Sequence, residues 1–137
     1  SFSYYCTEFS KILARLSCSG LNVKYWGDRS DYIRFLKGSD VILSYSSEEG
    51  LSTIIRESLF FKKLVVATNI SGNSGTLDDS NSYIIERNEE SVVSLFESLD
   101  PQSNTSQAKA IAGKKHYDEN LSKNTFQQRL RRVMNTL

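Results

Sequence analysis

The 137-residue sequence lacks most of the features that mark specialised classes of protein. Its 17 lysines and arginines nearly balance 16 aspartates and glutamates, so the formal net charge is only +1. Nucleic-acid-binding proteins obtain much of their affinity from clustered cations, and no long basic run is present here. The longest apolar runs, such as 64–67, fall far short of the roughly 20 residues that a membrane-spanning helix needs. The sequence therefore predicts neither a nucleic-acid partner nor a membrane span.

Cysteine, histidine and proline are also scarce, with two, one and one copies respectively. Cys6 and Cys18 form neither a CxxC pair nor a metal-ligand spacing, which favours reduced thiols in a cytoplasmic protein. No charged segment followed by an apolar stretch opens the chain, so no signal peptide is predicted. His116 falls in a polar helical pattern and is interpreted as a surface residue, and Asp78-Asp79 as a turn. The sequence contains no His/Cys cluster and no DxD motif that would suit a metal.

Short apolar runs alternate with amphipathic patterns along the chain, whose length suits a single domain with a sizeable core. This alternation predicts parallel strands joined by right-handed crossovers: an α/β, Rossmann-like sheet with helices on both faces. Ligands bind such sheets beyond the carboxyl ends of the strands, so we expect the site among 27–31, 44–53 and 69–76. The expected strands are 3–5, 23–26, 41–43, 64–68 and 83–85, and the expected helices are 9–16, 32–36, 54–59, 92–96 and much of the segment after Pro101.

The segment after the strand at 41–43 contains the residues best suited to hold a ligand. A polar loop with Gly50 leads into a helix beginning near Ser52 or Thr53, and either hydroxyl can cap that helix. The first amides of the helix would suit a phosphate. Glu57, flanked by apolar positions, is expected at a partly buried edge, where its carboxylate could accept hydrogen bonds from two adjacent ribose hydroxyls. A solvated helix with acidic residues near its start explains the same pattern, and local physics leaves that alternative open.

Several segments together resemble the C-terminal, donor-binding domain of GT-B glycosyltransferases. The similarity is to the large retaining group 1 family, which uses nucleotide-sugar donors and carries an E-x7-E motif. It covers nearly the whole chain. The segments that carry it are 22–27, Asp40-Val-Ile-Leu-Ser-Tyr-Ser, Glu49-Gly50 with Glu57, Lys63-Leu-Val-Val-Ala-Thr, 81–85 and the stretch from Tyr117. The resemblance implies a single Rossmann-like donor-binding domain over 1–137, with 117–137 as its terminal helical region. It also implies that a nucleotide-diphosphate sugar is bound as the substrate, with no metal and no other cofactor.

The resemblance assigns a role to each residue of the motif. Glu57 matches the second motif glutamate, which holds the donor ribose. Glu49 matches the first, which lies beside the donor sugar and is the expected catalytic residue. Gly50, Leu51 and Ser52 match the loop whose backbone amides meet the sugar hydroxyls and the pyrophosphate.

The chain also departs from the family pattern. Tyr45 replaces a common proline, and Lys62 stands where the family has a glycine, so the turn before the next strand is expected to differ. The family's Gly-Gly-x-Pro-Glu loop is 71–75 here and lacks the glutamate. The family's first strand and its N-terminal acceptor domain have no counterpart, so we expect a fragment that is inactive alone. Unpaired strand edges would then favour a homodimer or a strand swap.

The resemblance implies a full-length hexosyltransferase-type enzyme in polysaccharide synthesis. It would transfer a sugar, with retention, from a nucleotide-diphosphate donor to a saccharide or lipid-linked acceptor. We expect a cytoplasmic protein, with peripheral contact at the inner face of the membrane as an open alternative. Two further alternatives are a sugar-nucleotide 2-epimerase of the same architecture and a catalytically inactive nucleotide-sugar-binding module.

Overall fold

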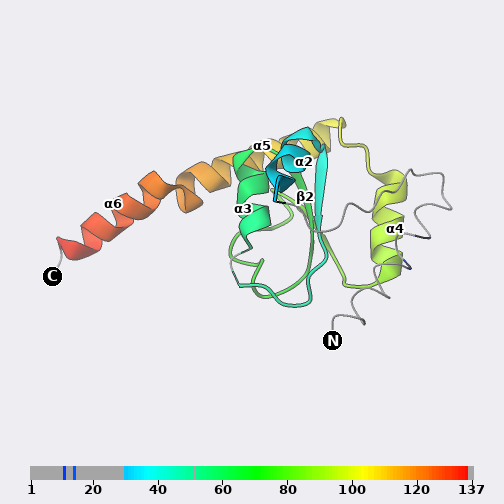
Figure 1. Ribbon diagram of the computed structural model, residues 1–137, viewed down its shortest axis with the longest axis horizontal. Coiled ribbons are helices and arrows are strands. Elements are labelled where there is room, and N and C mark those ends of the chain that lie inside the picture. The colour runs from blue at the N-terminus through cyan, green and yellow to red at the C-terminus, as the bar shows by residue number, and fades with distance from the viewer. Residues whose placement is uncertain (1–10, 12–13, 15–29, 51, 136–137) are drawn as a thin grey trace.

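The computed structural model describes residues 11, 14, 30–50 and 52–135 (Figure 1). The strands predicted at 3–5 and 23–26, and most of the helix predicted at 9–16, lie outside these residues. The other predicted elements are confirmed, and the chain order is α2 (Tyr32–Gly38), β1 (Val41–Ser44), α3 (Thr53–Phe60), β2 (Leu64–Thr68), β3 (Tyr83–Ile85), α4 (Glu89–Ser98), α5 (Asn104–His116), the π-helical turn η1 (Tyr117–Leu121) and α6 (Lys123–Met134).

The described sheet has three parallel strands in the order β1-β2-β3. Val41 pairs with Leu64 across β1 and β2, and Val66 pairs with Tyr83 across β2 and β3. Every residue of the central strand β2 is buried, as expected for a strand covered on both faces. Since the strands run in one direction, their carboxyl ends and the loops that follow them lie at one edge of the sheet.

Helices cover both faces of the sheet, as the alternating pattern predicts. On one face, Val65 and Ala67 of β2 pack with Ile55 and Leu59 of α3. On the other face, Val66 packs with Val92 of α4. Successive residues of a strand point to opposite faces, which explains why neighbouring residues of β2 enter different clusters.

The turn from α3 into β2 keeps a left-handed residue despite the loss of glycine. Lys62 has a φ of 56°, and no other non-glycine residue in the described part of the chain has a positive φ. Its amide donates to the Leu59 carbonyl at 3.0 Å, and the Lys63 amide donates to the Ser58 carbonyl at 2.8 Å. The expectation that a lysine here would change the turn is therefore wrong. These two bonds close the helix tightly enough to hold a residue with a Cβ in the left-handed region.

Replacing Lys62 with glycine should raise the free energy of unfolding by about 0.5–1 kcal/mol. The left-handed conformation costs a residue with a Cβ about 1–2 kcal/mol, and the greater freedom of glycine in the unfolded chain offsets only part of that gain. Urea denaturation measures the difference. Lys62→Ala is the matched control, because it removes the charge and the long side chain but keeps the Cβ. An equal gain in the alanine variant would contradict backbone strain as the cause.

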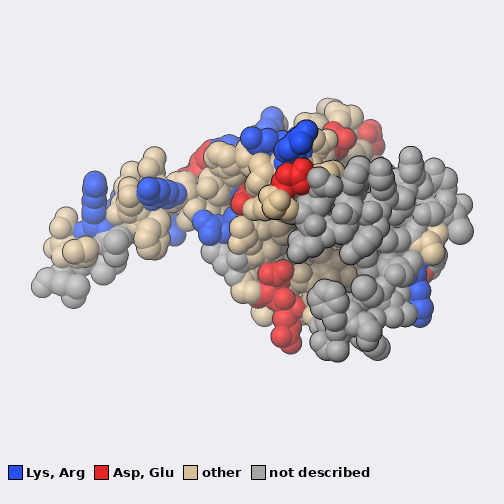
Figure 2. All heavy atoms as spheres, viewed as in Figure 1, with Lys and Arg blue, Asp and Glu red and all other residues tan. Residues whose placement is uncertain are grey.

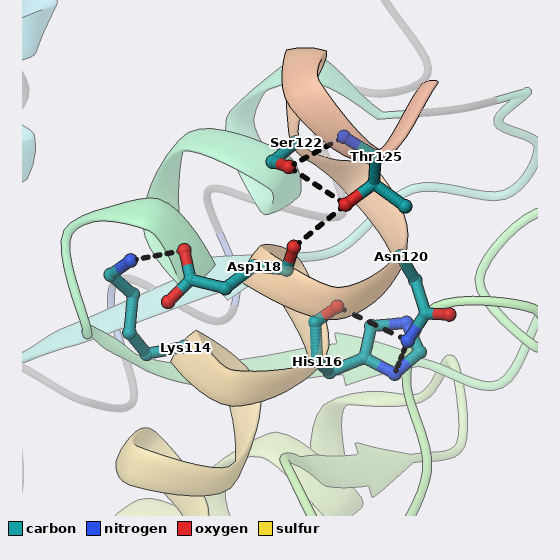
Figure 3. Close-up of polar contacts among 6 residues, drawn as sticks. All are labelled: Lys114, His116, Asp118, Asn120, Ser122 and Thr125. Carbon is teal, nitrogen blue, oxygen red and sulfur yellow. Dashed lines mark hydrogen bonds and ion pairs between the residues drawn. The ribbon is translucent and has the colours of Figure 1, made fainter. Parts of the chain in front are cut away.

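The C-terminal region bends at η1, and polar side chains fix the bend (Figure 3). The Thr125 hydroxyl donates to the Asp118 carbonyl at 2.9 Å, and its amide donates to Ser122 Oγ at 3.2 Å at the start of α6. Lys114 Nζ pairs with the Asp118 carboxylate at 2.5 Å. Beyond this bend α6 extends away from the body of the protein, and Phe126 on it is 65% exposed (Figure 1).

The surface near α6 carries scattered positive charge. On the described part of the face drawn in Figure 2, Lys and Arg atoms are interspersed with other residues and form no continuous basic area.

None of the described helices is both long and apolar enough to span a membrane.

His116, at the end of α5, is half-buried, so its interpretation as an ordinary surface residue is wrong. Its backbone carbonyl accepts from Asn120 Nδ2 at 3.3 Å, and its Nε2 atom is buried without a hydrogen-bond partner among the described residues. Because η1 continues the helix directly from α5, Asn120 of η1 lies against the ring, with its Nδ2 atom 3.5 Å from Nδ1 of His116 (Figure 3).

Candidate functional site

The loop that leaves β1 holds the Glu49 carboxylate through two successive hydrogen bonds. The Ser46 hydroxyl donates to Glu49 Oε1 at 2.8 Å, and the Thr68 hydroxyl of β2 donates to the Ser46 carbonyl at 2.6 Å. Glu49 is half-buried, whereas the neighbouring Glu48 is exposed. The two adjacent carboxylates therefore differ: one is held at the carboxyl edge of the sheet, and the other lies in solvent.

The loop that follows β2 packs directly on the loop that follows β1 and carries Glu48 and Glu49. A Cβ at Gly72 would lie 2.7 Å from the Glu49 carbonyl carbon and 2.8 Å from the Gly50 oxygen, and closer still to the Glu49 oxygen. Asn73, which is 3% exposed, donates through Nδ2 to the Thr68 carbonyl at 3.0 Å. The loops after β1 and β2 thus form one packed unit, and the absence of a side chain at Gly72 allows their close approach.

Glu57 lies in the second turn of α3 and is half-buried, which confirms the expected partly buried edge. Its Oε1 atom accepts a hydrogen bond from the Tyr32 hydroxyl of α2 at 3.0 Å. Its Oε2 atom is buried and has no hydrogen-bond partner among the described residues. The hydrogen bond to Glu57 raises the pKa of Tyr32 above its usual value, so the phenol remains a protonated donor at neutral pH.

A cavity of about 320 Å³ lies beside Glu57, lined by α3 and by Tyr117 of η1. Its volume is at the lower end of the roughly 300–1,000 Å³ range of small-molecule pockets. Arg56 also lines it, and the Nε atom of Arg56 is buried without a partner within the described ranges. Two of the side chains that line the cavity therefore each carry a buried polar atom, Oε2 of Glu57 and Nε of Arg56, that has no hydrogen-bond partner among the described residues. Its described lining residues are Thr53, Arg56, Glu57, Phe60 and Tyr117.

The sequence argument did not identify Arg56 or Tyr32 as site residues. A usable signal was present for Arg56, because Thr53, Arg56 and Glu57 are spaced i, i+3 and i+4 on one helical face. Nothing local pointed to Tyr32, whose contact with Glu57 spans 25 positions of sequence.

Of the predicted loop residues, those that the structure describes lie at the same edge of the sheet. Gly50 is exposed, and Leu51 lies outside the described residues. Ser52 occupies the N-cap position of α3, but its side chain makes no capping hydrogen bond, so the predicted hydroxyl cap is wrong at this residue. Ser52 is 6% exposed, so it is buried at the start of α3 without capping the first turn through its side chain.

The predicted turn at Asp78-Asp79 is confirmed. Asp78 Oδ1 accepts from the Ser80 amide at 2.8 Å and also from the Ser80 hydroxyl, and these bonds lower the pKa of Asp78. Across the part of the chain that the structure describes, no three His, Cys, Asp or Glu residues gather closely enough to hold a metal ion.

Comparison with known proteins identifies the fold. No protein-family model and no curated protein sequence matches the chain. HepE from Anabaena, solved in complex with UDP, matches with a TM-score of 0.78 at 17% identity over 98% of this chain and 38% of its own. A glycosyltransferase from Rickettsia africae ESF-5 matches with a TM-score of 0.70 at 23% identity over 96% of this chain and 36% of its own.

A third match is the C-terminal domain of LpcC, a glycosyl transferase group 1 family protein from Francisella tularensis. It has a TM-score of 0.63 and 18% identity, over 80% of this chain and 60% of that one. The chain therefore has the α/β fold of the GT-B C-terminal domain, which confirms the predicted fold class. It spans 38% of the length of HepE.

Proposed function

We propose that this chain binds the nucleotide-diphosphate-sugar donor of a retaining, group 1 glycosyltransferase. The observation that carries the proposal is the Glu57 carboxylate, whose Oε2 atom is buried, unpartnered among the described residues, and beside a ligand-sized cavity. A buried carboxylate oxygen without a donor is costly, and a ribose hydroxyl would supply that donor. The shared fold with HepE, which has been solved with UDP and with UDP-glucose, favours a uridine nucleotide.

In this proposal each site residue has a distinct task. Glu57 accepts hydrogen bonds from the ribose diol. Gly50, Leu51 and Ser52 present backbone amides to the sugar and the diphosphate, at the amino-terminal end of α3. Glu49, held by Ser46, lies beside the donor sugar as the catalytic carboxylate.

The proposed reaction breaks the bond between the anomeric carbon and the diphosphate oxygen. The acceptor hydroxyl oxygen forms the new bond on the same face, and its proton passes to the leaving diphosphate. The transition state is oxocarbenium-like, so a carboxylate at Glu49 would stabilise positive charge on the sugar. Amides and basic side chains would stabilise the leaving diphosphate, which is why no metal or other cofactor is proposed. The whole protein would act in the cytoplasm, and an N-terminal acceptor domain would complete the cleft.

Replacing Glu57 with glutamine should abolish most nucleotide binding while leaving the fold intact. The amide keeps one acceptor oxygen but loses the charge, and charge-assisted hydrogen bonds contribute about 1.5–3 kcal/mol, so we expect UDP to bind roughly 10–100-fold more weakly. Calorimetric titration with UDP, GDP, ADP and CMP measures the effect and identifies the base. Glu48→Gln is the matched control, since Glu48 is exposed in the neighbouring loop. Equal affinity in wild type and Glu57→Gln would refute the assignment of Glu57.

An epimerase of the same architecture is the second candidate, because it would use the same donor. Incubating the complete protein with donor and no acceptor separates the two functions. An epimerase changes the configuration of the sugar, whereas a transferase at most hydrolyses the donor slowly. An inactive binding module would retain nucleotide affinity and leave the donor unchanged.

A further inference from the structure

We propose that Tyr32 is a positioning residue for the donor ribose, because its phenol fixes the rotamer of Glu57 that leaves Oε2 ready for a ribose hydroxyl. This inference rests on the proposed function and extends the site from α3 to α2. Figure 1 shows α2 beside α3, and the Tyr32 hydroxyl bridges them by donating to Glu57 Oε1 at 3.0 Å.

Tyr32 is the one hydrogen-bond partner of the Glu57 carboxylate within the described residues. Arg56 lines the same cavity, yet no ion pair joins its guanidinium to Glu57. A glutamate side chain has several rotatable bonds, and ordering it costs conformational entropy. A carboxylate already held by Tyr32 has lost that freedom before the ligand arrives, which is preorganisation in the usual sense.

The hydrogen bond from Tyr32 leaves acceptor positions on the carboxylate for the ribose. An ionised carboxylate has about four acceptor positions on its two oxygens, and one phenol occupies one of them. The second position on Oε1 and both positions on Oε2 can accept the two hydroxyls of a cis-diol. Tyr32 therefore need not leave when the donor binds, and the residue, which is 40% exposed, lies at the edge of the site.

The test compares Tyr32→Phe with wild type in the binding of UDP and 2′-deoxy-UDP, using calorimetric titration of the full chain. The phenylalanine keeps the ring and removes only the hydroxyl. We expect UDP to bind about 5–10-fold more weakly, and the preference for UDP over 2′-deoxy-UDP to shrink, because the carboxylate is no longer aimed at the diol. Tyr83→Phe is the matched control: its hydroxyl pairs with Ser106 at 3.3 Å, on β3 and away from Glu57, so both affinities should stay unchanged.

The outcomes separate this inference from the proposed function. If wild type binds UDP and Glu57→Gln does not, but Tyr32→Phe leaves both affinities unchanged, then the role of Tyr32 is refuted and the donor site stands. Equal weakening toward both nucleotides would indicate a structural effect, and tighter UDP binding would identify the phenol as a competitor; either result overturns positioning. If wild type binds neither nucleotide, the donor site and the role of Tyr32 fail together.

Discussion

Gly72→Ala should destabilise the protein by about 3 kcal/mol, because overpacking against backbone leaves no side chain free to move aside. The added Cβ would lie 2.7 Å from the carbonyl carbon of Glu49 and 2.8 Å from the Gly50 oxygen. This overlap can be relieved only if the loops after β1 and β2 move apart. That movement would also displace Glu49, so nucleotide binding should weaken in the same variant.

Gly75→Ala is the matched control for this experiment. It lies in the same loop, and a Cβ there would meet nothing within 4 Å. Urea denaturation of both variants measures the difference in unfolding free energy. If Gly72→Ala is as stable as Gly75→Ala, the two loops are not packed as the structure places them, and the positioning of Glu49 by the β2 loop must be abandoned.

The contrast between these two glycines shows where sequence reasoning stops. Both occur in a stretch of small and polar residues that favours a turn. Resemblance to a glycine-rich family loop marked 71–75 as a unit without distinguishing its members. The distinction comes from a contact with Glu49, 23 positions earlier in the sequence, and no local pattern contains that information.

The strands and helices were predictable because their signals are local. The run 64–68 is mostly apolar and contains three β-branched residues, and in the structure every one of its residues is buried. Lys62 shows the limit, since local propensity argued for a changed turn. The bonds from Lys62 and Lys63 to α3 override that preference and keep the left-handed geometry.

The candidate site, like the fold, was predictable only where its signals are local. Glu57 could be expected at a partly buried edge, because apolar neighbours on a helix set the depth of the residue between them. Its partner Tyr32 and the cavity wall formed with Tyr117 depend on how α2 and η1 pack against α3. Tertiary packing decides such contacts, so only the structure could reveal them.

Leu59→Ala should lower the free energy of unfolding by about 3 kcal/mol, because Leu59 is fully buried and its loss leaves a cavity between α3 and α5. Urea denaturation measures the loss. Ile111→Ala is the control: it also shortens an aliphatic side chain on a helix, but Ile111 is 53% exposed, and we expect a change of less than about 1 kcal/mol.

The contact between Leu59 and Gly113 predicts that a second substitution restores part of the stability lost in Leu59→Ala. A Cβ at Gly113 of α5 would lie 2.7 Å from Leu59 Cδ2, so Gly113→Ala alone should destabilise the protein. In the Leu59→Ala background that atom is gone, and the new methyl group fills part of the cavity while alanine favours the helix more than glycine by about 0.5–1 kcal/mol. We therefore expect the double variant to be more stable than Leu59→Ala by about 1 kcal/mol. Additive losses would show that α5 does not approach α3 through Gly113, because coupling of this sign requires the two residues to share one space.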